Sequence, residues 1–246
     1  MKWISVIFIL LFTPPASAAM KTRIVDVGPG LCAITEIDKS HYFLYDAGHW
    51  QGRRCYDALS EMVIGNDIEL MVLSHSDSYH LGDAARILNN FSVKSIVRTG
   101  MGRSTATWRR TDEAISLEAS FGSQVYNLQE YKLKPGRLAF GLSGAQVSIL
   151  YGREAWTGLS ESENRNAISI AARLSYKGHS ILFTGDTIGR RLDDEPSACK
   201  DAKAEMVALH LDGHIDLDSD VIIAPHHEGN NGSASCSIKA VSKVAL

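Results

Sequence analysis

The sequence lacks three features that would point to common classes of protein. None of its four cysteines forms a CxxC pair, so a zinc cluster held by thiolates is not expected. It has no basic stripe, and its formal net charge of −3 is near neutral, so binding of nucleic acid through bulk electrostatics is not indicated. Beyond the first twenty residues, no apolar run is long enough to span a bilayer. A nucleic-acid substrate remains compatible with the chain, because a metal site can hold phosphate locally.

The first residues have the pattern of a secretory signal peptide. Lys2 gives a positive start, Trp3–Phe12 is apolar, and Ala16–Ala18 is a small-x-small cleavage signal. A membrane anchor is the weaker interpretation, since the apolar run is about half the length that a spanning helix needs. We therefore expect a signal peptide over residues 1–18, one domain over residues 19–246, and export to the periplasm or out of the cell.

Four cysteines remain after this cleavage, namely Cys32, Cys55, Cys199 and Cys236. An even count in an oxidising compartment predicts up to two disulfides. Three pairings are open, and the alternative that two of the four are buried free thiols is open as well.

Short strands and helices alternate along the rest of the chain. Runs of alternating or continuous apolar residues between turn residues predict strands, and a period of 3.6 predicts helices. The expected strands are 23–27, 32–37, 42–46, 68–73, 93–98, 124–128, 137–142, 146–150, 167–175, 180–184 and 221–224. The expected helices are 53–64, 83–89, 108–119, 198–209 and 234–241. Because no linker divides the chain, we expect an α/β domain with two sheets face to face and helices outside, an αββα sandwich.

Polar clusters with metal-binding side chains follow several of these strands. The hexamer His75–His80 (HSDSYH) follows one apolar strand, Asp186 follows a second, and the pair His226 and His227 follows a third. Imidazole and carboxylate groups are the ligands of zinc-type sites. One histidine at a strand end is ordinary, but three strand ends with such side chains are hard to explain by packing.

These segments resemble motifs of the metallo-β-lactamase fold superfamily. The motifs that carry the resemblance are Arg23–Gly30 (RIVDVGPG), Tyr45–Gly48 (YDAG), Ser74–Gly82 (SHSDSYHLG), Asn166–Ser169 with Phe183–Asp186, and Ala224–Gly229 (APHHEG). Their order is similar to that of the ComEC-like branch, the hydrolase domain of competence proteins. The resemblance implies a four-layer αββα sandwich with metal ions at one edge.

The resemblance also implies roles for individual residues. His75 and Asp77 would bind a first metal ion, His80 a second, and Asp186 would bridge the two. One histidine of the pair at 226 and 227 would complete the second site, and the sequence does not select which. Asp46 would support the site from behind its ligands, and Asn166 would lie near it. The catalytic candidates are Asp186, as bridge and proton acceptor, and Asp77.

The implied function is a secreted hydrolase that acts on a phosphodiester or related ester through a metal-bound hydroxide. Zinc is expected, as one or two ions, and manganese also suits a carboxylate-rich site. The alternative is a non-catalytic or mono-metal relative, because Tyr79 stands where the family has a metal-binding aspartate. The chain also stops at Ser242–Leu246, which resembles the start of a strand, so truncation at the C-terminus is a further expectation.

Overall fold

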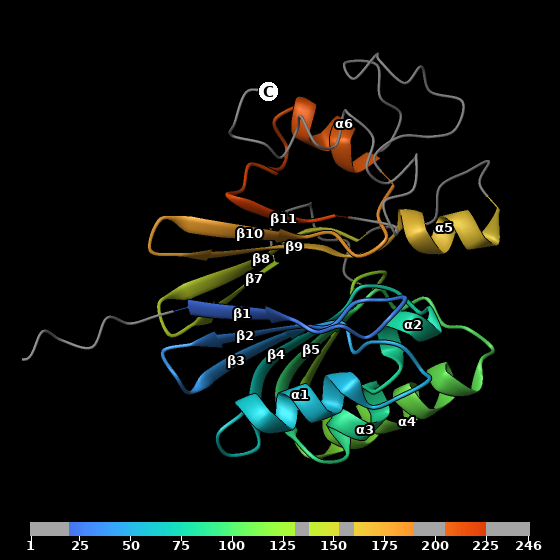
Figure 1. Ribbon diagram of the computed structural model, residues 1–246. Helices are drawn as coiled ribbons and strands as arrows, with labels where there is room; N and C mark the ends of the chain where they lie inside the picture. Colours follow the sequence, from blue (N-terminus) through green and yellow to red (C-terminus); the bar gives the residue numbers. More distant parts are fainter. Residues whose placement is uncertain (1–19, 131–137, 153–159, 189–204, 225–246) are drawn as a thin grey trace, which may run out of the picture.

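A computed structural model describes residues 20–130, 138–152, 160–188 and 205–224 of the chain (Figure 1). Its strands are β1 (Met20–Ile24), β2 (Ala33–Ile37), β3 (His41–Tyr45), β4 (Asp67–Leu73), β5 (Ser92–Arg98), β6 (Gln124–Asn127), β7 (Leu138–Leu142), β8 (Ala145–Tyr151), β9 (Ala171–Tyr176), β10 (His179–Phe183) and β11 (Val221–Ile223). Its helices are α1 (Arg54–Met62), α2 (Ser78–Leu81), α3 (Ala84–Leu88), α4 (Ala106–Ser120), α5 (Glu161–Ala167) and α6 (Glu205–Leu211). The predictions for the signal peptide, the last helix, Cys199, Cys236, His226 and His227 lie outside these residues.

The strands form two sheets that lie face to face. The first sheet has the order β1-β2-β3-β4-β5-β6, and the second has the order β11-β10-β9-β8-β7. Figure 1 shows α1, α3 and α4 on the outer face of the first sheet and α6 on the outer face of the second. The predicted αββα sandwich is confirmed.

Alternation along the strands of the first sheet explains this layering. Phe43, Tyr45 and Val72 point into the core between the two sheets, where they meet Phe183 of the second sheet. Their neighbours Leu44, Met71 and Leu73 point the other way and pack under α1, α3 and α4. Successive side chains of a strand point to opposite faces, so a strand with two buried faces reads as a continuous apolar run.

The second sheet has its own smaller outer core. Leu150, Ala171 and Leu182 pack there with Met206 of α6 and with Leu217. Among the described residues, no helix combines the length and the apolar character needed to cross a membrane.

Two helices were not expected from the sequence. Residues 161–167 form α5, whereas the pattern predicted a strand from 167 onward, which begins only at Ala171. A capping box explains the helix, since Ser160 accepts the N–H of Glu163 and the Glu163 carboxylate accepts the N–H of Ser160. The short helix α2 lies within the predicted metal-binding hexamer.

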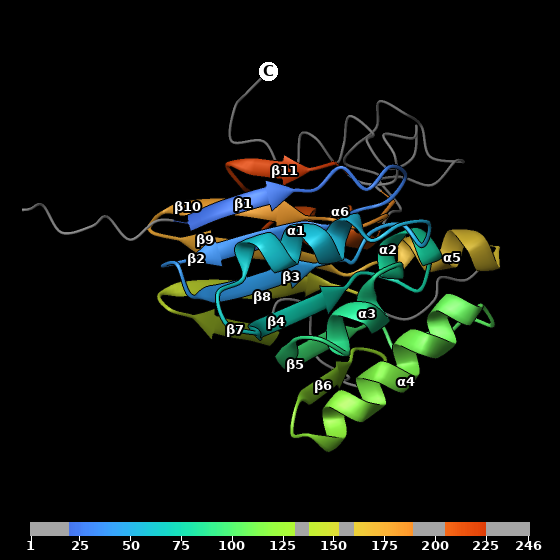
Figure 2. The same cartoon turned by 60° about the horizontal axis from the view of Figure 1, so that its bottom comes forward.

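Parallel pairing brings the ends of the central strands to one edge of the sandwich. Strands β3, β4, β5 and β6 are parallel to one another in the first sheet, as are β10 and β11 in the second. Figure 2, turned from the first view, shows α2 and α5 at this same end of the molecule. Side chains that follow the strands can therefore converge there.

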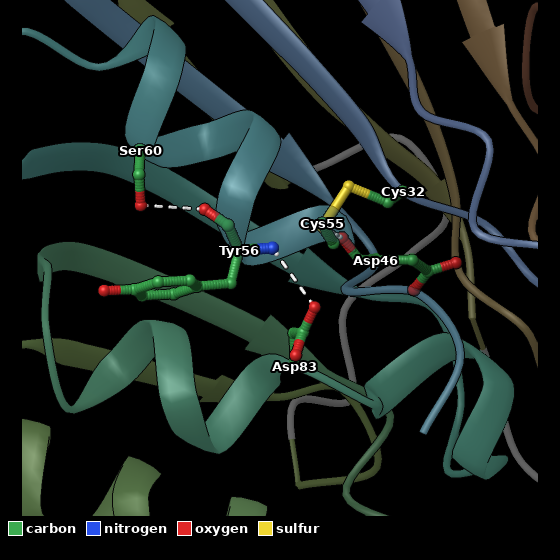
Figure 3. The surroundings of a disulfide bond; sticks show 6 residues. All are labelled: Cys32, Asp46, Cys55, Tyr56, Ser60 and Asp83. Atoms are coloured by element: carbon green, nitrogen blue, oxygen red, sulfur yellow. Dashed lines mark hydrogen bonds between the residues drawn. A yellow bond between two sulfur atoms is a disulfide. The ribbon is translucent and has the colours of Figure 1, made fainter. Parts of the chain in front are cut away.

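A disulfide joins this edge to the first helix. Cys32 lies immediately before β2, Cys55 lies in the first turn of α1, and both are fully buried. Figure 3 shows the neighbouring contacts: the N–H of Tyr56 donates to the carboxylate of Asp83 at 3.1 Å, and Cys55 Sγ lies 3.9 Å from the carbonyl oxygen of Asp46. Of the pairings that the sequence left open, the structure contains this one.

We predict that the double variant Cys32→Ala/Cys55→Ala is less stable than the native protein by about 3 kcal/mol in its free energy of unfolding. The bond closes a loop with a sequence separation of 23 residues, so its loss frees the unfolded chain. Urea denaturation under oxidising conditions measures the difference. A variant as stable as the native protein would contradict the prediction.

Candidate metal centre

The hexamer His75–His80 turns sharply after β4. Asp77 has an extended backbone and precedes α2, so His80 lies on that helix while His75 lies in the preceding turn. Gly82 closes the turn against the chain after β3, where an added Cβ would lie 2.2 Å from the carbonyl carbon of His49. The close approach of two backbones therefore requires glycine at this position.

Three side chains from two sheets converge at this edge. One ligand atom each from His75, His80 and Asp186 lies within 4.8 Å of the other two, and all three residues are buried. His80 Nε2 is 3.2 Å from Asp186 Oδ1, and His75 Nε2 is 3.7 Å from Asp186 Oδ2. Two imidazoles and a carboxylate at these separations fit around one divalent ion.

The buried carboxylate of Asp46 fixes the orientation of His80. Asp46 Oδ2 lies 2.6 Å from His80 Nδ1, and it also accepts the hydroxyl of Ser74 at 2.8 Å. Its other oxygen accepts the backbone N–H of Ser74 at 2.7 Å. Asp46 itself has a φ of 57°, a left-handed conformation that aspartate tolerates better than most residues. The structure thus places Asp46 behind the ligand cluster, in contact with it.

His75 is oriented by two hydroxyls. Its Nδ1 lies 3.0 Å from Ser74 Oγ and 3.1 Å from Ser169 Oγ. Because the Ser74 hydroxyl donates to Asp46, its oxygen accepts from His75, which puts the proton of the neutral imidazole on Nδ1. Ser169 Oγ also accepts the backbone N–H of Asp186 at 3.1 Å, so one hydroxyl joins the two ligand segments.

Both histidines direct their other ring nitrogen into the cluster. In the described part of the chain, Nε2 of His75 is buried and makes no hydrogen bond, and Nε2 of His80 is buried beside the carboxylate of Asp186. Buried polar atoms normally have partners, and a pair of such nitrogens beside a carboxylate is the donor set of a metal site. The residues present therefore fit a divalent ion.

Charges near the two imidazoles separate their pKa values. Burial, reinforced by the proximity of His80, lowers the pKa of His75 to about 4. Burial also disfavours charge on His80, but the carboxylates of Asp46 and Asp186 outweigh it and raise the pKa to about 10. At neutral pH and without an ion, His80 therefore carries a proton and His75 does not.

Asp77 lies beside this cluster and has three further partners. Its Oδ2 is 4.0 Å from His75 Nε2 and accepts the Tyr79 hydroxyl at 2.8 Å. Its Oδ1 accepts Nε of Arg165 at 3.0 Å and Nη1 of Arg103. Burial raises the pKa of the Asp77 carboxyl, but His75, Tyr79 and the two guanidinium groups outweigh it, so the pKa lies below its usual value. Burial and Asp77 raise the pKa of Tyr79, which therefore stays protonated and donates.

The structure brings four of the predicted site residues together: His75, Asp77, His80 and Asp186. Asn166 is buried in α5, directly after Arg165. His226 and His227 lie outside the described residues.

Two residues at this edge, Arg103 and Arg165, were not expected from the sequence. Arg103 follows the end of β5, so the rule that functional side chains follow strands would have found it, whereas Arg165 depends on the unexpected helix α5.

No family model matches the chain, and no curated protein matches it. Solved structures similar to it include metallo-β-lactamase fold proteins. YhfI from Bacillus subtilis has 11% identity and a TM-score of 0.47, with 83% of this chain and 70% of that chain covered. The metallo-β-lactamase from Hirschia baltica has 15% identity and a TM-score of 0.43, with 92% and 94% covered. The metallo-β-lactamase SMB-1, bound to 2-mercaptoethanesulfonate, has 16% identity and a TM-score of 0.48, with 85% and 78% covered. Similarity at this level carries no conclusion about the chemistry of this chain.

We predict that the chelator-treated protein loses stability as the pH rises from 6.5 toward 10. His80 has its pKa raised from 6.5 to about 10, so its protonated form contributes stability that is complete below pH 6.5 and lost as the pH rises through the folded-state pKa. Free energies of unfolding measured by urea denaturation across this range test the slope. His80→Gln should flatten it, whereas the matched change at an exposed histidine, His179→Gln, should not. Equal slopes in the native protein and in His80→Gln would contradict the assignment.

Proposed function

We propose that this protein is a metal-dependent hydrolase whose centre is built on His75, His80 and Asp186. The observation that carries the proposal is the convergence of two buried imidazole nitrogens, Nε2 of His75 and of His80, on the carboxylate of Asp186, with the three ligand atoms within 4.8 Å of one another. A fold that only needed packing at this edge would not bury two imidazoles against one carboxylate and leave Nε2 of His75 without a hydrogen bond in the described chain.

Zinc is the ion that this donor set favours. Imidazole nitrogen and carboxylate oxygen both suit zinc, and manganese is the alternative where carboxylates dominate. When bound, such an ion lowers the pKa of a water molecule and polarises the bond to be cleaved.

The residues of the chain have separate tasks around this ion. Asp46 and Ser74 hold both imidazoles with Nε2 toward the centre. Asp186, whose backbone N–H is fixed by Ser169, supplies a carboxylate as ligand and as proton acceptor. Asp77 lies 4.0 Å from His75 and would be a further ligand if two ions bind. One of His226 and His227 would complete the set.

We propose a phosphodiester or related ester as substrate and a place in the ComEC-like branch. The sequence motifs support both, since the DVGPG, YDAG, SHSDSYHLG, TGD and APHHEG segments follow the order of that branch. Export to the periplasm or out of the cell is proposed from the N-terminal pattern. The Cys32–Cys55 disulfide supports export, because such bonds persist in oxidising compartments.

A specific contact favours a second candidate function. Tyr79 occupies the family position of a metal-binding aspartate, and its hydroxyl is bound to Asp77. A phenol of raised pKa does not replace a carboxylate ligand. A mono-metal or non-catalytic relative, which binds rather than cleaves, is therefore the alternative.

We predict that the purified protein contains a divalent ion and hydrolyses bis(p-nitrophenyl) phosphate. His80→Ala should lose the ion and lower the rate by about a hundredfold or more, because it removes a ligand. His179→Ala changes an exposed histidine away from this edge and should leave both unchanged. Elemental analysis and initial rates measure the two effects. A native protein without bound metal, even after incubation with zinc or manganese, would overturn the proposal.

The variant Tyr79→Asp separates the two candidate functions. If the native protein is a hydrolase, activity is present before the change and Tyr79→Asp adds metal content or rate. Activity that appears only in Tyr79→Asp would establish that the native chain is a non-catalytic relative.

A further inference from the structure

We infer that Arg103 and Arg165 form an anion-binding subsite beside the metal centre, with Asp77 as the anchor that holds them in place. The subsite would take a negatively charged oxygen of the substrate, such as the non-bridging oxygen of a phosphodiester. The identity of the substrate rests on the proposed function. The geometry of the subsite rests on Arg103, Arg165 and Asp77, which are not the residues on which the proposed metal centre is built.

The first argument is the convergence of two guanidinium groups from distant segments. Arg103 belongs to the loop between β5 and α4, and Arg165 belongs to α5. Both donate to the same oxygen of Asp77, Arg165 through Nε at 3.0 Å and Arg103 through Nη1. The two cations share one buried carboxylate, and the other carboxylate that contacts them in the described residues, that of Glu161, is 89% exposed and screened by solvent. The buried side of the arginine pair therefore favours an anion.

The second argument is burial. The side chains of Asp77 and Arg165 are 6% and 9% exposed, so the pair lies in a region of low dielectric where unbalanced charge acts strongly. Arg103 is 30% exposed and forms the solvent-facing side of the subsite. An anion could therefore reach the guanidinium groups from solvent.

The third argument is donor capacity. A guanidinium group has five N–H donors. Arg103 uses one of them on Asp77, and Arg165 uses one on Asp77 and one on the exposed carboxylate of Glu161. No other contact among the described residues uses the remaining donors, and a guanidinium fork can bind two oxygens of a phosphate group side by side.

The fourth argument is position. Asp77 Oδ1 faces the arginines, whereas Asp77 Oδ2 lies 4.0 Å from His75 Nε2 in the ligand cluster. One carboxylate group thus separates the two sites. A substrate whose reacting group lies at the ligand cluster can place a neighbouring charged oxygen against Arg103.

Binding of inorganic phosphate to the chelator-treated full chain tests the subsite by isothermal titration calorimetry. Removal of metal prevents phosphate from binding to an ion instead. We expect measurable binding that weakens with added salt and that Arg103→Gln weakens by about tenfold or more. Arg110→Gln, a matched change at an exposed arginine of α4, should alter the dissociation constant by less than about twofold.

Further variants keep the test decisive. Arg103→Lys keeps the charge but not the planar fork and should fall between the native protein and Arg103→Gln. Arg165→Gln should also weaken phosphate binding, and circular dichroism checks that the variants remain folded. If Arg103→Gln binds phosphate as tightly as the native protein, or if the native protein binds none at millimolar phosphate, the arginines only neutralise Asp77 and the inference is wrong.

Metal content and diester hydrolysis in the same variants separate this inference from the proposed function. Arg103→Gln should keep its bound ion and raise KM for the diester more than it lowers kcat. If the chelator-treated native protein binds no phosphate while the metal-loaded native protein is active, the subsite alone is refuted. Phosphate binding in a protein that takes up no metal would refute the hydrolase and leave the subsite standing.

Discussion

The candidate site depends on one buried carboxylate, that of Asp46. It accepts two hydrogen bonds from Ser74 and contacts His80 Nδ1 at 2.6 Å, so it orients one imidazole directly and determines the tautomer of the other through the Ser74 hydroxyl. An unpaired carboxylate at 0% exposure would be costly, so these contacts hold the end of β3 to the end of β4. The left-handed backbone of Asp46 is a local strain of about 1–3 kcal/mol that these hydrogen bonds offset. The hydrogen bonds of Asp46 thus both orient the candidate ligands and hold the ends of β3 and β4 together.

The layers of the fold could be predicted from the sequence because a strand that is buried on both faces appears as a continuous apolar run. The apolar run of β4, followed at once by the hexamer, fixed both a central strand and the edge where the site lies. The helix α5 could not be predicted in this way. Residues 161–167 include polar and charged side chains without an apolar period, and a capping box together with the contact of Arg165 to Asp77 specifies the helix instead. Local capping and one long-range ion pair are invisible to a method that follows hydrophobic periodicity.

The same distinction applies to the site. Residue type and strand ends sufficed to select His75, His80 and Asp186, since few other residue types hold a divalent ion. The sequence could not predict whether Asp77 acts as a metal ligand, as an anchor for other side chains or as both. Its role depends on Arg103 and Arg165, which lie 26 and 88 positions away along the chain. Spacing along the chain carries no information about such partners. The substitution at Tyr79 was visible, but its contact with Asp77 was not.

Tyr79 and the arginines together change the electrostatic balance of the edge. A carboxylate at position 79 would add a negative charge beside Asp77 and favour a second cation. The phenol adds none, and two guanidinium groups already supply positive charge to Asp77. Fixed cations and a bound metal ion both neutralise carboxylates, but only the former carry directional N–H donors and need no uptake from solution. The edge is therefore divided into a part around His80 and Asp186 that would hold the proposed ion and a part where guanidinium groups of the chain meet the carboxylate of Asp77. That division explains how the fold can retain a stable arrangement at Asp77 whether or not a second ion is present.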